Sequence, residues 1–425
     1  MLVDGAPEGS GLSPRRWVIL SVCVLGFMQS YVHRFGFAPL IPGFIADLGL
    51  TYAAAGTIMS AYFWTYGAAQ VPVGVLTDRW GPRRVMLAFL SVLVAGVLAF
   101  TLSRSYAQSL LSRCLVGLGA AAVWLPGLRL INEWFGPSER GRATGLLSAG
   151  GGVGGTTALL LIPLLAERLG WRMGYGLLLI PLALTLILVG LVIRPLAAES
   201  PDPRPVARGE APPGDETAPG PLAQVGRVLS APAMWPLNIA VLFSYGGYIG
   251  LITWVPTFLA KDQGLTGAAA GLVTGLMTAG TIVSWPVAGF LSDRFGRRKP
   301  LYLWSQGVSA AACLAFALVV PHSGAAGAAA VAVLTGLGLG GIVIPFVMVT
   351  ELFPAELVGT ASGVVNTFCF IGALLIPVAL GYILDITGSF PMAFLGCAGV
   401  QSLALVTAAF TRETRKAGQG IMVSS

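Results

Sequence analysis

The stretches GVLTDRWGPRR at residues 74–84 and GFLSDRFGRRK at residues 289–299 are two copies of one pattern. They are separated by close to half the length of a chain of 425 residues. Each copy begins at the end of a long apolar segment and finishes in a basic cluster. The repeat therefore indicates two related halves that each carry the same charged turn after their second apolar segment.

The shared pattern G-x-L-x-D-R-x-G-x-R-[RK] has a physical interpretation. The first glycine permits a neighbouring helix to approach closely, and the second permits a tight turn. The acid, Asp78 or Asp293, lies at a helix end, where it could pair with an arginine of the loop or meet the N-terminus of a neighbouring helix. The alternative is that these charges only anchor the turn at the membrane surface. Because the pattern occurs twice, we expect it to form a cytoplasmic gate. The expected gate residues are Gly74, Asp78, Arg79, Gly81, Arg84, Gly289, Asp293, Arg294, Gly296 and Arg298.

The composition excludes several classes of protein. Hydrophobic residues make up 55% of the chain and charged residues only 10%, whereas a soluble chain carries about a quarter charged residues. A cytosolic enzyme, a disordered chain and a nucleic-acid-binding protein are therefore excluded. The five cysteines are odd in number and lack the spacing of a metal site. We expect no disulfide framework, no metal and no cofactor.

Twelve apolar segments are each long enough to cross a membrane as a helix. Uninterrupted apolar runs exclude the alternation of a β-barrel. The predicted fold is an all-α membrane protein with twelve transmembrane helices in two pseudo-symmetric six-helix bundles. The segments are 17–42, 52–76, 84–103, 106–135, 143–166, 173–193, 234–259, 267–290, 300–320, 324–350, 357–384 and 388–410.

The distribution of basic residues sets the expected orientation. With a cytoplasmic N-terminus, 18 Lys and Arg residues lie inside and four lie outside, namely Arg104, Arg168, Arg172 and Lys261. This excess on one side fits the positive-inside rule. We therefore expect a multi-pass protein of the cell membrane with both termini in the cytoplasm.

The most polar stretch, 195–230, is rich in Pro, Gly and both signs of charge, as a solvated linker is. It divides the chain six segments to six. The predicted domains are an N-terminal bundle at 1–193, a cytoplasmic linker at 194–231 and a C-terminal bundle at 232–425.

The doubled charged turn resembles the signature of the major facilitator superfamily, and the resemblance covers essentially the whole chain. A second pattern of that superfamily, R-x-x-x-G-x-G, is present as Arg113, Gly117 and Gly119 on the fourth segment. The resemblance implies alternating access by rocking of two halves about a central site, driven by gradients and not by ATP. No GxxxxGK[ST] loop is present, in agreement with this implication.

Two arginines lie inside apolar segments, where an unpaired charge is costly. Arg34 is three residues after Tyr31, on the same helical face, and Arg113 shares a stripe with Gly117, Ala121 and Trp124. No acid lies deep in the surrounding segments, so we expect an electropositive cavity that binds an anion such as a carboxylate. Arg113 has the alternative of a purely structural role. The expected substrate-binding residues are Arg34, Arg113, Tyr31, Trp124, Tyr245, Tyr248 and Asn366, and the aromatic ones could instead serve helix packing.

The segment INEWFGPSERGRATG resembles the exit of helix four in the anion:cation symporter family, which includes carriers of sugar acids and organic anions. The two carboxylates of that family are replaced here by His33 and Ala120. His33 could carry a coupling proton because imidazole titrates near neutral pH, or it could be a neutral, hydrogen-bonded core residue. Anion exchange and facilitated passage therefore stay open. Near the exit of the same helix, Arg129 and Glu133 are expected to form an ion pair within one helix.

Two related families of anion carriers each have a characteristic arginine that this chain lacks. Organophosphate:phosphate antiporters pair a first-helix arginine with one on helix seven, and nitrate carriers show an arginine on helix two. Segments 234–259 and 52–76 contain no arginine.

The sequence thus predicts a secondary active transporter, not an enzyme, that moves a monocarboxylate or sugar acid with or without a proton. The alternatives are a proton-driven exporter of amphiphilic drugs and, in another class, a non-transporting membrane receptor. The expected partners are the anionic substrate, the lipid bilayer and, if coupling exists, a proton. One twelve-helix unit encloses its own pathway, so we expect a monomer.

Overall fold

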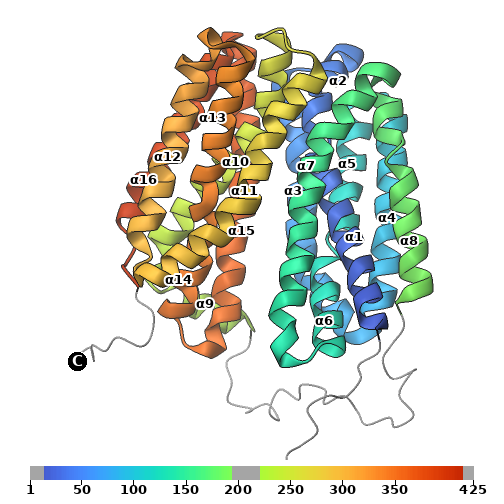
Figure 1. Cartoon of the computed structure of the whole chain (residues 1–425), viewed down its shortest axis with the longest axis vertical. Coiled ribbons are helices and arrows are strands. Elements are labelled where there is room, and N and C mark those ends of the chain that lie inside the picture. The colour runs from blue at the N-terminus through green and yellow to red at the C-terminus, as the bar shows by residue number, and fades with distance from the viewer. Residues whose placement is uncertain (1–13, 194–220, 415–425) are drawn as a thin grey trace, which may run out of the picture.

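The computed structural model describes residues 14–193 and 221–414, and within these ranges the chain forms helices and no strand (Figure 1). The first half contains α1 (Arg15–Phe35), α2 (Ile41–Leu48), α3 (Tyr52–Trp80), α4 (Pro82–Leu102), α5 (Tyr106–Ala120), α6 (Trp124–Trp134), α7 (Pro137–Gly176) and α8 (Leu179–Val192). The second half contains α9 (Pro221–Leu229), α10 (Met234–Lys261), α11 (Gly267–Phe295), α12 (Lys299–Leu318), α13 (Gly324–Gly338), α14 (Ile344–Leu352), α15 (Ala355–Thr387) and α16 (Phe390–Ala409). The predicted linker lies mostly at 194–220, outside the described residues, so the domain boundaries stay a prediction.

The twelve predicted crossings have counterparts among the described helices. Within the described ranges, ten helical stretches are long and apolar enough to span a membrane. One of them, Ser138–Val192, is 55 residues long and makes two crossings, because the chain turns at Gly170, where φ is 77°. α3 is not among the ten, and its 29 residues include polar side chains such as Gln70. The fold is that of a twelve-helix membrane protein, as predicted.

The fourth and tenth crossings are broken in the middle, which the sequence did not predict. The fourth crossing turns at residues 121–123 between α5 and α6, and the tenth passes through a short 3-10 helix, Leu339–Val343, between α13 and α14. The expected stripe from Arg113 to Trp124 is therefore interrupted, since the two residues belong to different helices. The break occurs at the equivalent crossing of both halves, in keeping with the repeat.

Glycines let helices of one half pack with their backbones in contact, as small residues do in membranes. A Cβ atom on Gly117 would lie 2.2 Å from the carbonyl oxygen of Tyr62 on α3. A Cβ atom on Gly119 would lie 2.3 Å from the backbone nitrogen of Leu93 on α4. The two glycines of the R-x-x-x-G-x-G pattern thus hold α5 against both neighbours.

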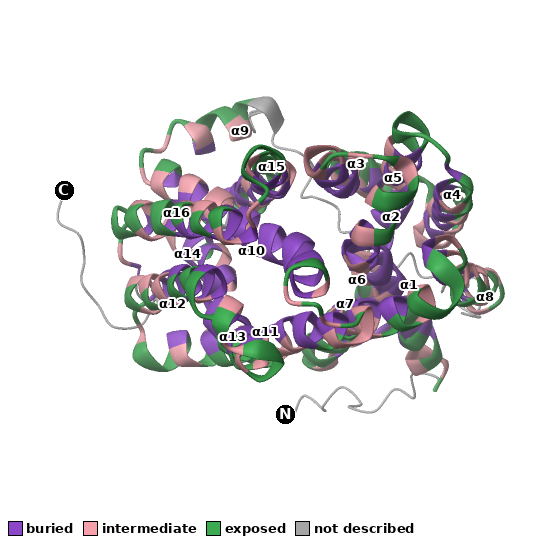
Figure 2. Cartoon of the chain, turned by 90° about the horizontal axis from the view of Figure 1, so that it is seen from above, coloured by how far each residue is buried: buried purple, intermediate pink, exposed green. Residues whose placement is uncertain are grey.

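The two halves meet through α3 beside α15 and α7 beside α11 (Figure 2). We call the end of the molecule that carries α2 the α2 end and the opposite one the α9 end (Figure 1). Within the described residues, every hydrogen bond between the halves lies from the α2 end to the middle of the bundle, such as Ser60 Oγ to Ala373 O at 3.2 Å and Thr156 Oγ1 with Thr278 Oγ1 at 3.3 Å. The described parts of the halves are therefore joined at the α2 end and make no hydrogen bond with each other at the α9 end.

Gly117→Ala is expected to lower the stability of the fold by about 1–3 kcal/mol, because its Cβ would force α5 away from α3. Gly145→Ala is the matched control, since no atom of the described ranges lies within 4 Å of the position that a methyl group on this helical glycine would take. The melting temperatures of the two purified variants in detergent check this. Equal melting temperatures would contradict the close packing of α5 against α3.

Candidate functional site

Arg34 lies in the last turn of α1, directly before the chain bends at Gly36 into η1 (Ala38–Leu40) and α2. Its side chain is buried, at 4% exposure. The guanidinium carbon lies 4.2 Å from the centroid of the Tyr31 ring and 4.6 Å from that of Tyr66. Tyr31 and Arg34 therefore share a face, as their spacing of three residues predicts.

Neither Arg34 nor Arg113, the two buried arginines of the first half, has a carboxylate partner within the described residues. The ion pairs found there join other groups, and the Arg34 Nε atom has no hydrogen-bond partner. The faces of aromatic rings attract cations, by roughly 2 kcal/mol or more when water is excluded. The rings around Arg34 offset part of the cost of its burial, and its positive charge has no counter-charge in the part of the chain that the structure describes.

Arg113 is fully buried inside the first half and makes different contacts. Its Nη1 atom donates to the carbonyl oxygen of His33 at 2.8 Å and to the hydroxyl of Tyr175 at 3.4 Å. Among the described residues, its Nε and Nη2 atoms have no partner. The Tyr62 ring is common to both arginines, since its centroid lies 5.4 Å from the guanidinium carbon of Arg113 and 5.5 Å from that of Arg34. Tyr62 is itself held by donating to Ser30 O at 3.0 Å.

His33 points toward α7. Its Nδ1 atom lies 3.2 Å from the Tyr175 hydroxyl, and its Nε2 atom has no partner in the described part of the chain. His33, Arg113 and Tyr175 thus form one buried polar cluster. The sequence singled out the first two residues and missed Tyr175, because nothing near Tyr175 in the chain signals a contact with α1 142 residues away.

The aromatic residues predicted for the second half reach the surroundings of Arg34. Tyr248 on α10 is buried, and its ring centroid lies 6.0 Å from that of Tyr245 and 6.4 Å from that of Phe35 on α1. Phe370 on α15 lies 5.6 Å from Tyr66. Aromatic contacts therefore connect the residues around Arg34 with both α10 and α15 of the opposite half.

Two further predicted residues are less directly connected. Trp124 lies 5.0 Å from the ring of Phe27, which in turn lies 5.1 Å from the ring of Tyr31. Asn366 is half-buried on α15, four residues before Phe370. The substrate roles of all these residues stay predictions.

At the α9 end of the first half, Asp78 pairs with Arg129 on α6 rather than with an arginine of its own loop. Arg129 also binds Glu133 at 3.0 Å, which confirms the predicted pair within one helix. Arg79 and Arg84 are exposed. Gly81 has a φ of 81°, so the tight turn requires glycine as expected.

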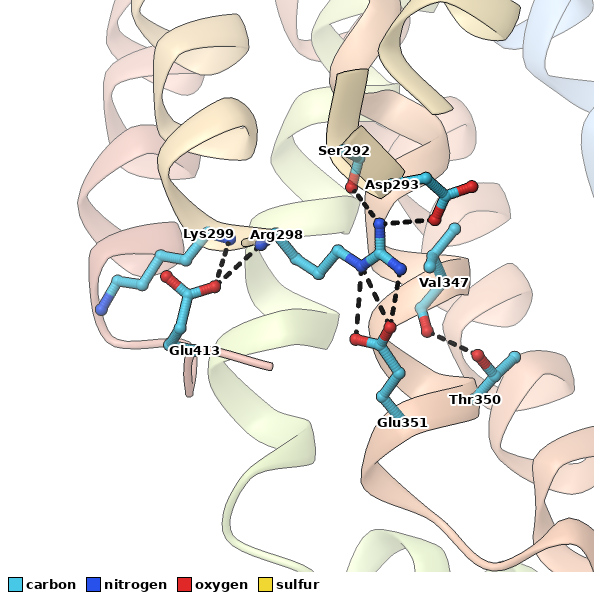
Figure 3. A network of polar contacts seen from close by, with 8 residues as sticks. All are labelled: Ser292, Asp293, Arg298, Lys299, Val347, Thr350, Glu351 and Glu413. Carbon is cyan, nitrogen blue, oxygen red and sulfur yellow. Dashed lines mark hydrogen bonds and ion pairs between the residues drawn. The ribbon is translucent and has the colours of Figure 1, made fainter. Parts of the chain in front are cut away.

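The equivalent turn of the second half contains a more deeply buried network (Figure 3). Arg298, whose side chain is 3% exposed, binds Asp293 at 2.9 Å and Glu351 at 2.7 Å. The hydrogen bonds that Glu351 accepts raise the pKa of Arg298 above its ordinary value, so this guanidinium stays charged. Gly296 has a φ of 60°, and Arg294 is exposed.

Gly74 and Gly289, the first glycines of the two turns, were expected to permit close approach of a neighbouring helix, and the structure does not show such an approach in the described residues. Among the described residues, a Cβ atom on Gly289 would meet no atom within 4 Å, and one on Gly74 would meet only Leu125 at 3.8 Å. Neither glycine therefore serves a close approach here, because no described helix packs its backbone against them at this end. Both charge networks stay within their own half, so the gate role of these residues stays a prediction.

Comparison with known proteins identifies the class. The fold and the repeated halves define a multi-pass membrane transporter. The sequence profile of the Major Facilitator Superfamily matches residues 22–270 and 256–421. The chain therefore belongs to the major facilitator superfamily, which confirms the resemblance drawn from the repeated turns.

Three relatives of the chain are transporters and not enzymes. The chain is 26% identical over 356 residues to the probable nitrate/nitrite transporter NarK2 of Mycobacterium tuberculosis, covering 82% of this chain and 84% of the relative. It is 25% identical over 398 residues to the probable sulfoacetate transporter SauU of Cupriavidus necator, covering 89% and 90%. It is 24% identical over 412 residues to the hexuronate transporter of Bacillus subtilis, covering 92% and 93%.

A solved structure agrees with the fold. A bacterial homolog of the human lysosomal transporter Spinster, in an inward-facing and unoccupied conformation, matches with a TM-score of 0.75 and 19% identity over 95% of each chain. This likeness supports the architecture alone.

The two charge networks at the α9 end are expected to differ in strength. Arg298→Ala leaves Glu351, 14% exposed, and Asp293 without their partner, at a cost of about 1–3 kcal/mol. Arg129→Ala removes pairs that are more exposed, with Arg129 at 38% and Asp78 at 77%, and should cost under about 1 kcal/mol. Thermal unfolding of both variants checks the order, and a greater loss in Arg129→Ala would contradict it.

Proposed function

We propose that the protein is a secondary active transporter that carries a small organic anion, a monocarboxylate or sugar acid, across the cell membrane by alternating access. One observation carries the proposal: Arg34 is buried at the boundary of the two halves without a carboxylate partner among the described residues. A solute carboxylate would supply the missing charge.

The chemistry of Arg34 suits a carboxylate. A guanidinium group offers a planar fork of donors that matches the two oxygens of a carboxylate. The Tyr31 and Tyr66 rings restrict the side chain, so less conformational entropy is lost when the anion binds. The names of these relatives support an anionic solute, since nitrate, sulfoacetate and hexuronate are all anions, and the last two are organic carboxylates.

The position of Arg34 links binding to movement. Tyr66 contacts Phe370 of the second half, and Phe35, next to Arg34, contacts Tyr248. An anion that draws Arg34 and these rings together would change the contacts between the halves. In this proposal Arg113 assists from behind Tyr62, and Tyr245 and Asn366 form the opposite wall.

The excess of basic residues at the α9 end supports an orientation with that end in the cytoplasm. The halves would then be joined on the outer side, and the conformation described here would be inward-facing. The turns with Asp78 and Asp293 would close the inner gate in the opposite conformation.

Arg34→Ala is expected to lower anion uptake into proteoliposomes at least about a hundredfold, because a charged, bidentate contact is lost. Arg34→Lys keeps the charge without the planar fork and should retain part of the activity. Arg104→Ala removes an exposed arginine at the α2 end and serves as the control. The substrate is first selected by a thermal-shift screen of carboxylates, sugar acids and nitrate on the wild-type chain. Wild-type uptake in Arg34→Ala would contradict the proposal.

His33→Gln tests whether a proton is coupled to the anion. If the imidazole carries the proton, an imposed inward proton gradient should accelerate uptake by the wild-type chain and not by the variant. Anion exchange at equal pH should persist in both. His322→Gln, which changes the other histidine of the chain at an exposed site, is the control. An unchanged response to the gradient in His33→Gln would remove His33 from the coupling step.

A further inference from the structure

We propose that Glu167 and Asp385 are two equivalent latches that hold the α2 end closed, each by capping the N-terminus of a helix in the opposite half. The latches act on the movement of the halves and do not depend on which solute is carried. The two residues were not among the sites expected from the sequence.

Asp385 lies near the end of α15 and reaches the first turn of α3. Its two carboxylate oxygens accept hydrogen bonds from the backbone nitrogens of Tyr52 at 2.7 Å and Ala53 at 2.8 Å. The first N–H groups of a helix have no partner within the helix, and the helix dipole favours a negative charge there. Thr51, the N-cap residue, satisfies only the next nitrogen, that of Ala54.

Glu167 lies on α7 and makes the matching contact with α11. Its Oε1 atom accepts a hydrogen bond from the backbone nitrogen of Ala268 at 2.9 Å. Thr266, the N-cap residue of α11, accepts from Ala269, one residue further along. The first turns of α3 and α11 are therefore capped alike. In each helix the N-cap threonine accepts a hydrogen bond from the backbone N–H of the third helical residue, and an acidic residue of the opposite half accepts one from the N–H of the second.

The two latches are related by the repeat that divides the chain. Thr266 follows Thr51 at the same offset that separates the two charged turns, and Asp385 follows Glu167 at nearly that offset. Each acid thus occupies the same place in its half and crosses to the equivalent helix of the other. Such a pair closes the α2 end on both sides of the pathway.

Glycines one turn below the latches make the approach possible. A Cβ atom on Gly56 of α3 would lie 2.8 Å from the carbonyl oxygen of Pro377 on α15. A Cβ atom on Gly271 of α11 would lie 2.2 Å from the carbonyl oxygen of Leu159 on α7. Gly56 and Gly271 are separated by the same number of residues as Thr51 and Thr266. Their contact residues, Pro377 and Leu159, are separated by the same number of residues as Asp385 and Glu167. Backbone contact at this level places each helix N-terminus within reach of its acid.

The latches exist only while the α2 end is closed. When the halves separate there, both carboxylates and both helix N-termini lose their partners and are hydrated instead. By contrast, Asp78 and Asp293 at the α9 end bind arginines of their own half. Within the described residues, acids of one half therefore contact the other half at the α2 end alone, and these contacts favour the conformation described here.

The experiment measures the distance between the halves at the α2 end by double electron–electron resonance spectroscopy of two spin labels, with the protein in lipid nanodiscs. The labels are attached at Arg104→Cys and Ala325→Cys, which are exposed positions of opposite halves, after replacement of the five native cysteines. Asp385→Asn and Glu167→Gln are each expected to raise the ratio of long to short distances about tenfold. The double variant should raise it about a hundredfold, since the sites are well separated.

Asp262→Asn is the matched control, because the carboxylate of this exposed residue at the same end accepts a hydrogen bond only from its neighbour Gln263 among the described residues. It should leave the distance distribution unchanged. Asp385→Glu retains a carboxylate and should restore most of the short distance. If the double variant of Asp385→Asn and Glu167→Gln shows the same distance distribution as Asp262→Asn, the proposal is wrong.

A second test removes the donor and leaves the carboxylate in place. Ala268→Pro removes the N–H group that donates a hydrogen bond to Glu167. Proline is tolerated in the first turn of a helix, and Pro300 already occupies the second position of α12. The expected shift equals that of Glu167→Gln, and combining the two should add nothing further. If the distance shifts of Glu167→Gln and Ala268→Pro add in the combined variant, Glu167 does not act through the N-terminus of α11. Because Ala268→Pro keeps the carboxylate, this test also holds if Glu167→Gln folds poorly.

Discussion

A positive charge in the interior of a membrane protein needs a partner, and the arrangement around Arg34 follows from that constraint. The guanidinium is surrounded by tyrosine rings, which attract it but carry no net charge. A carboxylate side chain in the same place would neutralise it permanently and leave nothing for a solute to do. The rings keep the arginine ordered and its charge available, which is the condition that an anion-binding site requires.

The same constraint gives the two arginines different roles. Arg113 is fixed by the backbone of α1 through His33 O and by Tyr175, so it also holds the helix that carries Arg34 in position. Arg34 instead lies against the Tyr66 ring, which contacts Phe370 of the second half. The proposed anion site therefore combines Arg113, fixed inside one half, with Arg34 at the boundary between the halves.

Much of the architecture could be predicted from the sequence, because apolar length and repeated turns are local signals. The positive φ values at Gly81 and Gly296 follow from the turn pattern, and the Arg129–Glu133 pair follows from helical spacing. Partners far apart in the chain could not be predicted. Tyr175 beside His33 and Asp385 at the start of α3 depend on how helices pack, which periodicity does not encode.

The most direct measurement is the position of a bound anion. Crystals grown with a brominated carboxylate that stabilises the protein would locate the bromine by anomalous scattering and the carboxylate by difference density. We expect the carboxylate within hydrogen-bond distance of the Arg34 guanidinium, between the two halves. A carboxylate bound elsewhere, with Arg34 still enclosed by its rings alone, would contradict an anion site at this arginine.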